Sequence, residues 1–197
     1  MSLWCRLAVA ALALASAPAV RAAETPQAAP LAPEAVVETE AGSFSIRLRP
    51  DLAPGHVRHF LKTAKAGGYE GTTFHRLIPR GIIQGGDPLS KDPRQAARYG
   101  TGGLGLLKAE FSEVPFARGV VAAARRPSSP DSGGSQFFIC LTEQPSLLRQ
   151  YTVFGEVVAG MEVVDKLAET RVEGDRPTVR LVIRKVTVSD GGAPAKP

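Results

Sequence analysis

Hydrophobic and polar residues alternate near both ends of the region between residues 35 and 188. In AVVETEAGSFSIRLR (35–49), alternate positions on either side of Ala41-Gly42 are apolar: Val37, Phe44, Ile46 and Leu48. Alternation around a glycine-containing turn predicts a β-hairpin. In TVRLVIRKVTV (178–188), Val179, Leu181 and Ile183 alternate in the same way, which predicts a closing strand.

Two other segments have the spacing of an amphipathic helix. In residues 53–69 the apolar positions are i, i+3, i+4 and i+7, and Gly67-Gly68 ends the segment. These apolar residues are Val57, Phe60, Leu61 and Ala64. GMEVVDKLAET (160–170) repeats the pattern over a shorter length, with Val163, Val164 and Leu167 on one side. We therefore expect two helices.

The remaining apolar segments are short runs separated by glycine, proline and charged residues. They are TTFHRLI (72–78), GIIQGG (81–86), GVVAAA (119–124), SQFFICL (135–141) and YTVFGEVV (151–158). Many short strands with two helices predict a mainly β protein, in which a closed or sandwiched antiparallel sheet is capped by helices. The 197 residues, 44% of them hydrophobic, are enough for one domain with a sizeable core.

The N-terminus has the pattern of a secretory signal peptide. Arg6 precedes the apolar run LAVAALALASAPAV, and Val20-Arg21-Ala22 has small residues at the positions of a cleavage site. We expect a signal peptide at 1–22, a Pro/Ala-rich linker at 23–34, a domain at 35–189 and a tail at 190–197. This organisation predicts a periplasmic or secreted protein without stable membrane insertion after cleavage. An uncleaved anchor is the alternative.

The charge distribution and the cysteine content argue against nucleic-acid binding, an internal disulfide and a nucleophilic cysteine. The formal net charge is +5, but the basic residues are spread along the chain without interleaved aromatic residues, so we expect no nucleic-acid partner. Cleavage after Ala22 would leave Cys140 as a single cysteine, which cannot form an internal disulfide. Its apolar surroundings, QFFIC, predict a buried thiol rather than a nucleophile.

Two patterns suggest other chemistry. GTGGLG (100–105) matches the dinucleotide fingerprint, but the strand and helix that this motif needs are not predicted around it, so a close-packed glycine loop is favoured. His56 and His59 lie three residues apart on a helix and could bind a metal ion, but no third ligand is evident. We expect both histidines to face solvent, with no metal and no cofactor.

The segment FHRLIPRGIIQGGD (74–87) has an arginine in an apolar context. In a regular strand Phe74 and Arg76 would point to the same side, which would place the charge beside aromatic neighbours. One interpretation is a structural ion pair, for example with Glu110 or Asp87. The other is a functional cation in a groove.

Taken together, the chain resembles the cyclophilin-type peptidyl-prolyl isomerases over nearly all of residues 35–188. The motifs YEGTTFHRLIPRGIIQGGD, YGTGG, GVVAAAR, SGGSQFFIC and TVFGEVVAGMEVVDKL occur in the order and spacing of that family. The resemblance implies a closed eight-stranded antiparallel β-barrel capped by two α-helices, with a substrate groove on one outer face. It implies prolyl isomerisation without cofactors, on proline-containing segments of unfolded or partly folded exported proteins. We expect a monomer.

The resemblance also implies roles for individual residues. Arg76 and Gln84 match the catalytic positions. The matched substrate-binding positions are Phe74, Ile82, Gly100, Thr101, Ala123, Ala124, Arg125, Gln136, Phe138, Leu147 and Tyr151. By this match Arg76 provides the cation, while Phe138, Ile82 and Leu147 form the proline pocket.

The chain departs from the family pattern at several groove positions. Gly81 and Ser146 replace aromatic residues, Tyr151 replaces a histidine, and Arg125 stands where asparagine is frequent. Loss of the ring at position 81 would remove one side of the proline pocket, unless the Pro79-Arg80 turn brings another side chain into the gap. The alternative function is therefore a weakly active or inactive peptide-binding module or holdase.

Overall fold

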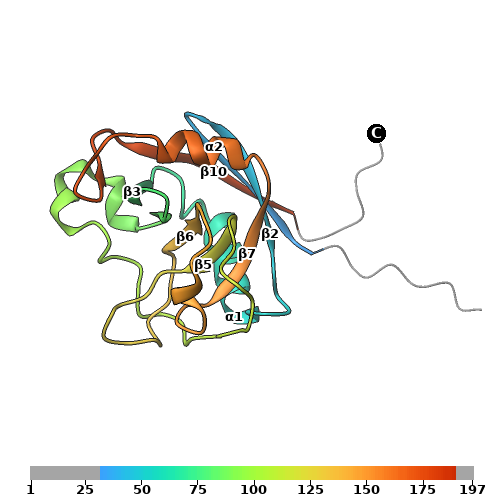
Figure 1. Ribbon diagram of the computed structural model, residues 1–197. Coiled ribbons are helices and arrows are strands. Elements are labelled where there is room, and N and C mark those ends of the chain that lie inside the picture. Colours follow the sequence, from blue (N-terminus) through green and yellow to red (C-terminus); the bar gives the residue numbers. More distant parts are fainter. Residues whose placement is uncertain (1–31, 190–197) are drawn as a thin grey trace, which may run out of the picture.

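The structure, a computed structural model, describes residues 32–189, and its central element is a closed antiparallel barrel (Figure 1). The strands follow the order β1-β10-β3-β4-β6-β5-β7-β2. Their bounds are β1 Glu34–Thr39, β2 Gly42–Leu48, β3 Thr73–Ile78, β4 Ile82–Gly85, β5 Val120–Ala123, β6 Phe137–Cys140, β7 Val153–Ala159 and β10 Leu181–Ser189. The predicted barrel of eight strands is confirmed.

Two α-helices lie at opposite ends of the barrel, α1 (Pro54–Lys65) at one and α2 (Met161–Ala168) at the other (Figure 1). Both were expected from their apolar spacing. Val57, Phe60 and Ala64 of α1 are buried, because the i, i+3 and i+7 positions form one face toward the barrel. Neither helix of residues 32–189 is long and apolar enough to cross a membrane.

Short elements that the sequence pattern did not predict complete the described region. They are the 3₁₀ helices η1 (Pro88–Lys91), η2 (Pro93–Arg98) and η3 (Pro145–Leu147), and the two-stranded sheet of β8 (Val172–Glu173) and β9 (Arg176–Pro177). The expected strand of residues 178–188 begins later, at Leu181, so Val179 is 60% exposed rather than part of the alternating face. The predicted signal peptide and C-terminal tail lie outside the described residues, as does most of the predicted linker.

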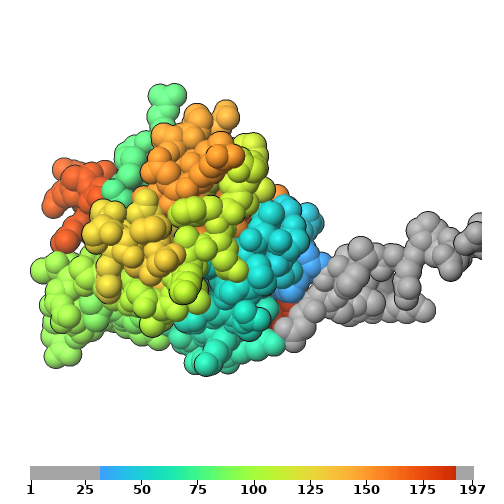
Figure 2. All heavy atoms as spheres, turned by 90° about the horizontal axis from the view of Figure 1, so that it is seen from below, coloured from blue at the N-terminus to red at the C-terminus, as the bar shows by residue number. Residues whose placement is uncertain are grey.

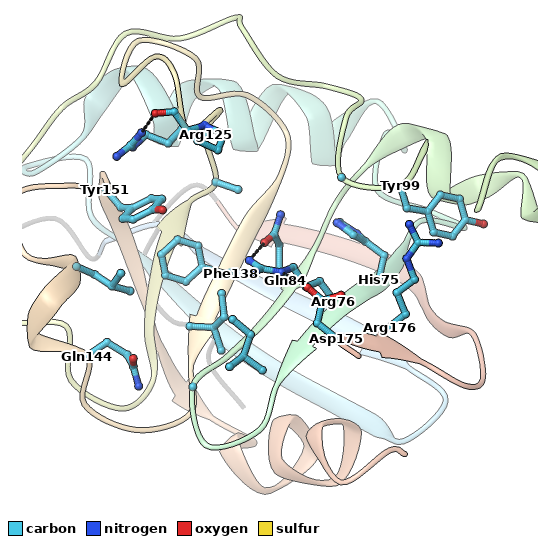
Figure 3. A pocket seen from close by; sticks show the side chains of 17 residues that line it. His75, Arg76, Gln84, Tyr99, Arg125, Phe138, Gln144, Tyr151, Asp175 and Arg176 are labelled. Carbon is cyan, nitrogen blue, oxygen red and sulfur yellow. Dashed lines mark hydrogen bonds and ion pairs between the residues drawn. The ribbon is translucent and has the colours of Figure 1, made fainter. Parts of the chain in front are cut away.

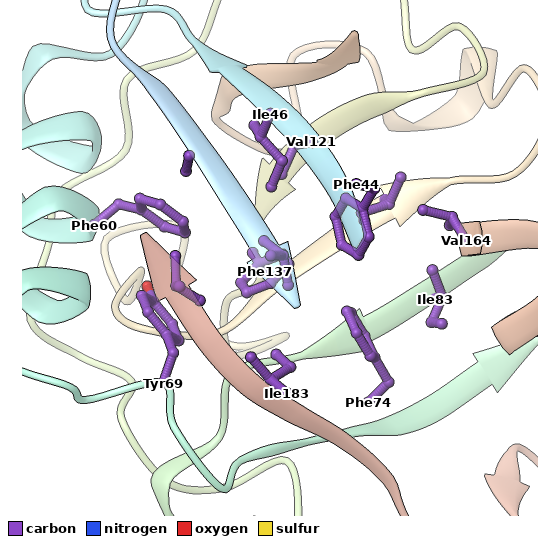
Figure 4. Packing of buried hydrophobic residues seen from close by; sticks show 14 of the residues in the cluster. Phe44, Ile46, Phe60, Tyr69, Phe74, Ile83, Val121, Phe137, Val164 and Ile183 are labelled. Atoms are coloured by element: carbon purple, nitrogen blue, oxygen red, sulfur yellow. The ribbon is translucent and has the colours of Figure 1, made fainter. Parts of the chain in front are cut away.

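The barrel interior is filled by aromatic and branched side chains (Figure 4). Phe137 of β6 lies among three other rings, and its ring centroid is 6.0 Å from Phe60, 5.9 Å from Tyr69 and 6.0 Å from Phe74, all in edge-to-face geometry. Such pairs add specific geometry to the burial of a large apolar area. This core fixes the strands whose opposite faces form the site.

Strands β4, β5 and β6 are buried on both faces, which explains why their sequences are continuous apolar runs. Ile83, Phe137 and Ile139 point into the barrel. Ile82 and Phe138 point outward into a second apolar cluster, together with Phe116, Val120, Ala122, Ala124, Cys140 and Val153. Leu147 and Tyr151 pack against this outer cluster and give the barrel an apolar outer surface in this region.

Candidate functional site

A β-bulge at His75 directs Arg76 out of the barrel. Phe74 pairs with Gly85 and Arg76 pairs with Gln84, so two residues of β3 are matched by one residue of β4. The extra residue changes the side of the sheet to which the following side chains point. Phe74 is 1% exposed within the barrel core, whereas Arg76 lines an outer cavity. Our expectation that Phe74 and Arg76 share a face is therefore wrong.

Figure 3 shows the outer cavity, which has a volume of about 600 Å³. It lies over β3, β4 and β6 and is bounded by the loops that follow η2, β5 and β6. Nine of the sequence-predicted residues line it: Arg76, Ile82, Gln84, Gly100, Ala124, Arg125, Phe138, Leu147 and Tyr151. The fold thus brings together residues that are up to 75 positions apart, from Arg76 to Tyr151.

Four sequence-predicted residues do not line this cavity. Phe74 and Ala123 point into the barrel core, because each lies on the inward-facing side of its strand. Thr101 is exposed, and its hydroxyl donates to the carbonyl oxygen of Arg98 at 2.8 Å. Gln136 is fully buried, and its side chain is connected to the cavity lining through its hydrogen bond with Gln84.

A chain of hydrogen bonds holds the polar side of the cavity. Arg76 Nη1 donates to Gln84 Oε1 at 3.4 Å, and Gln84 Nε2 donates to Gln136 Oε1 at 2.9 Å. Gln136 Nε2 then donates to the Gly102 carbonyl oxygen at 2.6 Å. Because buried amides need such partners, the chain fixes the orientation of Gln84 toward Arg76.

The ion-pair partner of Arg76 is Asp175, whose Oδ2 accepts a hydrogen bond from Arg76 Nε at 2.7 Å. Glu110 and Asp87, the partners that we expected, are used elsewhere. Glu110 binds the first amides of α1, and Asp87 accepts hydrogen bonds from the backbone nitrogens of Leu89 and Gly100. The expected carboxylates were wrong, because Asp175 lies in the sequence-distant β8–β9 turn.

The apolar side of the cavity is built on Phe138. Its ring lies 5.3 Å from Tyr151 in perpendicular geometry and 6.4 Å from Phe116, on which it stacks. In Figure 3 Phe138 lies between Tyr151 and Gln84, so the apolar and polar sides of the cavity meet at this ring. Ile82 and Leu147 add aliphatic surface. The cavity therefore offers a guanidinium beside a pocket that suits a compact apolar ring.

Comparison with known proteins agrees with this geometry. The family model described as cyclophilin type peptidyl-prolyl cis-trans isomerase/CLD matches residues 35–188. The chain belongs to the cyclophilin family. The predicted enzyme class, a peptidyl-prolyl cis-trans isomerase, is confirmed by the family and its curated members.

Cyclophilins from distant organisms are similar over most of the chain. A probable peptidyl-prolyl cis-trans isomerase of Brucella suis is 43% identical over 82% of this chain and 84% of its own length. The Arabidopsis thaliana isomerase CYP18-2 is 33% identical over 80% of this chain and 94% of its own length. A crystal structure of a Cryptosporidium parvum cyclophilin, determined in the presence of the dipeptide Ala-Pro, has a TM-score of 0.71 and 27% identity. It covers 79% of this chain and 98% of that chain.

At one edge of the cyclophilin cavity, Arg125 is fixed above Tyr151. Its Cζ atom lies 4.8 Å from the centre of the ring, its Nε donates to the Gln150 carbonyl oxygen at 2.8 Å, and its Nη1 donates to the carbonyl oxygen of Arg126 at 3.1 Å. A guanidinium over an aromatic face is attracted by the ring. The residue that replaces asparagine in this cyclophilin thus supports the ring of Tyr151.

His75 lines the same cavity but is nearly buried. It is 7% exposed, and its Nε2 has no hydrogen-bond partner within residues 32–189. Burial lowers the pKa of His75 below its ordinary value, against the opposing effect of the Asp87 charge. A neutral imidazole is therefore favoured at this position.

Other residues line the cavity without having been predicted from the sequence. They are His75, Ile78, Tyr99, Pro127, Gln144, Asp175 and Arg176, whereas Gly81, which also lines the cavity, was expected at the proline pocket. Tyr99 directly precedes Gly100, a predicted substrate-binding residue, but Asp175 and Arg176 come from a two-residue strand and its turn. Such short elements have no periodicity that sequence reasoning could detect.

His56 and the glycine loop, which suggested other chemistry, both make structural contacts within residues 32–189. His56 is 4% exposed and its Nδ1 lies 2.6 Å from Glu110 Oε2, so our expectation of a solvent-facing residue is wrong. Residues 32–189 contain no cluster of histidine, cysteine and carboxylate side chains that could hold a metal ion. In the glycine loop, the Gly103 carbonyl oxygen accepts from Ser135 N at 2.8 Å, which confirms the predicted close backbone packing.

Proposed function

We propose that this cyclophilin catalyses cis-trans isomerisation of prolyl peptide bonds in exported proteins. The supporting observation is the position of the Arg76 guanidinium at the border of the apolar cavity formed around Phe138. Proline-containing segments are the substrates typical of the family. An exported protein that is only partly folded exposes such segments.

The reaction needs a change in electron distribution rather than a nucleophile. A peptide bond resists rotation by about 18–20 kcal/mol, because the nitrogen shares its lone pair with the carbonyl group. In the twisted state this lone pair is localised on the nitrogen. A guanidinium beside the prolyl nitrogen stabilises the twisted state more than the planar state, which lowers the barrier. No covalent bond is broken, so the step requires no cofactor.

Each side of the cavity has a distinct task in this proposal. Phe138, Ile82 and Leu147 hold the proline ring and exclude water, which strengthens electrostatic interactions at the border. Arg76 provides the cation, and an arginine remains charged at any physiological pH. Gln84, which is held by Gln136, provides a polar anchor for the peptide backbone.

A protease-coupled assay with a proline-containing test peptide examines this function. Wild-type protein should accelerate the cis-to-trans conversion, and Arg76→Ala should lower kcat/KM by at least about a hundredfold, as for loss of other transition-state donors. Arg76→Lys tests whether positive charge alone is sufficient. Arg47→Ala is a matched control, because Arg47 pairs with Glu34 and Glu156 away from the cavity. Equal rates for wild type and Arg76→Ala would refute the proposal.

The proposal of export depends on the pattern of residues 1–22. We infer that cleavage near Ala22 releases a monomeric periplasmic or secreted domain, whose clients are unfolded or partly folded exported proteins. Mass spectrometry of protein from periplasmic and membrane fractions tests this inference. Recovery of the full-length chain in the membrane fraction would instead support the uncleaved anchor.

A second candidate function is peptide binding with little catalysis. It is favoured by Ser146, which is exposed and does not line the cavity, so that no side chain closes the groove at this position. Calorimetric binding of the test peptide without acceleration of its isomerisation would support this alternative. Acceleration that is abolished in Arg76→Ala would exclude it.

A further inference from the structure

The turn between β8 and β9 is attached to β3 at two consecutive residues. The Asp175 carbonyl oxygen accepts a hydrogen bond from Leu77 N at 2.7 Å, and the Asp175 side chain accepts one from Arg76 Nε at 2.7 Å. The backbone bond places Asp175 independently of the ion pair. The Asp175 carboxylate therefore lies beside Arg76, the arginine that provides the cation in our proposed mechanism.

The local sequence favours this position of Asp175. Glu173 pairs with Arg176, which leaves Gly174 and Asp175 as a two-residue loop. Gly174 has a φ of +68°, and Asp175 is not among the residues with positive φ. Positive φ at the first loop residue alone is the pattern of a type II′ turn, which favours glycine at that position. The turn is therefore tight, and the place of Asp175 is set by few rotatable bonds.

The Arg76 guanidinium is held along two of its edges. Asp175 binds Nε and Gln84 binds Nη1, at 2.7 Å and 3.4 Å respectively. An arginine has five N–H donors in a planar fork, so fixing two of them fixes the plane of the group. Within residues 32–189 Nη2 has no hydrogen-bond partner, which leaves donors for a substrate.

The ion pair between Arg76 and Asp175 is expected to add little to the stability of the fold. The side chains of Arg76 and Asp175 are 42% and 50% exposed, and exposed pairs contribute little to folding. An arginine side chain has many rotamers, and a misplaced catalytic group lowers the rate steeply. Orientation of Arg76 is the effect that the geometry supports.

We infer that Asp175 is a positioning residue, which holds the Arg76 guanidinium in the orientation required for prolyl isomerisation. The inference rests on the proposed function, since it assigns a task within the same site. Asp175 contacts Arg76 and acts through it. An acceptor oxygen at position 175 is the property that matters, because it is the oxygen that binds Nε.

The first test compares kcat and KM for Asp175→Ala and Asp175→Asn in the isomerisation assay. Asp175→Ala should lower kcat about tenfold with KM nearly unchanged, because orientation acts on the transition state. Asp175→Asn keeps an acceptor oxygen and should stay within about threefold of wild type. Asp165→Ala is the matched control, since Asp165 forms a similar exposed pair with Arg118 outside the cavity. Equal kcat for Asp175→Ala and wild type, or equal losses in Asp175→Ala and Asp175→Asn, would overturn the inference.

The second test does not depend on activity. The Nε–H resonance of Arg76 in ¹⁵N-edited NMR spectra should be shifted and slow to exchange in wild type and in Asp175→Asn, and should exchange faster in Asp175→Ala. An unchanged resonance in Asp175→Ala would show that Asp175 does not hold the guanidinium. Wild-type protein that lacks isomerase activity would refute the proposed function, while the NMR result would still decide whether Asp175 orients Arg76.

Discussion

Ile78 occupies the space that a side chain at Gly81 would need. A Cβ atom on Gly81 would lie 2.8 Å from Ile78 Cγ2 and 3.2 Å from the Ile78 carbonyl oxygen. The two residues close a tight turn, in which Gly81 N donates to Ile78 O at 2.9 Å and Arg80 has a φ of +58°. We considered that the Pro79-Arg80 turn could bring another side chain to the place of the aromatic ring missing at position 81. The structure shows Ile78 there, since it lines the cavity together with Gly81.

This relationship predicts that an aromatic residue cannot simply be restored at position 81. Gly81→Phe should lower the free energy of unfolding by about 1–3 kcal/mol, as overpacking does elsewhere. Because the strained turn borders the cavity, kcat/KM should also fall rather than rise. Urea unfolding and the isomerisation assay measure the two effects.

The double variant Ile78→Ala/Gly81→Phe is the control for the Gly81→Phe result. It removes the Cγ2 atom that a side chain at Gly81 would meet, so part of the lost stability should return. A Gly81→Phe protein that is as stable as wild type and faster would contradict our account of the turn.

The buried amide of Gln136 should matter for both stability and rate. Gln136→Ala leaves Gln84 Nε2 and the Gly102 carbonyl oxygen without their partner, which should cost about 1–3 kcal/mol for each group that stays buried. Gln84 also loses its orientation, so we expect kcat/KM to fall about tenfold. Gln95→Ala, which removes a 3.3 Å bond from Arg98, is the comparison, and an equal effect of both variants would argue against the hydrogen-bond chain.

Glu110 should make folding sensitive to acid. Figure 2 shows the yellow-green segment that contains Glu110 beside α1, where its carboxylate accepts hydrogen bonds from Gly55 N and His56 N, both at 3.0 Å. Burial would raise the pKa of Glu110, but the bonds from the His56 side chain and these two amides lower it below its ordinary value. A lowered folded-state pKa stabilises the fold above the unfolded-state pKa of about 4.3 and ceases to do so as the pH falls through the folded-state value.

Glu110→Gln measures this contribution. We expect the variant to be less stable than wild type by about 0.5–2 kcal/mol at pH 7, the range for loss of a helix-capping side chain, and the difference to shrink toward pH 3. Urea unfolding at both pH values provides the comparison. A difference that does not change with pH would show that the charge of Glu110 is unimportant.

Cys140 should be chemically inert in the folded protein. It is fully buried, and burial raises the pKa of its thiol to about 12. Ellman's reagent should therefore label Cys140 only after unfolding in urea. The Cys5→Ser variant removes the other cysteine of the full chain from the count. Rapid labelling of folded Cys5→Ser protein would disprove the buried position.

Sequence pattern was a good guide to the parts of the fold that have periodicity. Alternation identified β1 and β2 around Ala41-Gly42, and helical spacing identified α1 and α2. Motif resemblance then located nine residues of the cavity. These features are local, or are local motifs in a characteristic order, so they can be recognised before the chain is folded.

Other expectations failed because a local irregularity or a contact with a sequence-distant residue determined the direction or burial of a side chain. The bulge at His75 reversed the expected facing of Phe74, and a bulge cannot be seen in an alternating pattern. His56 was expected in solvent, but Glu110 reaches it from 54 residues away. The composition of a helix face does not reveal which loop will cover it.

The sequence by itself determined the eight barrel strands and the two helices, because each leaves a pattern in a short segment. The resemblance of its motifs to the cyclophilins added the apolar pocket residues and Arg76 as the candidate cation. Only the tertiary structure decided which way Arg76 points and what holds it. Barrel closure places β10 beside β3, and the β8–β9 turn before β10 then brings Asp175 to Arg76 across 99 residues of sequence. Such a contact depends on the closing geometry of the whole barrel, which no short segment encodes.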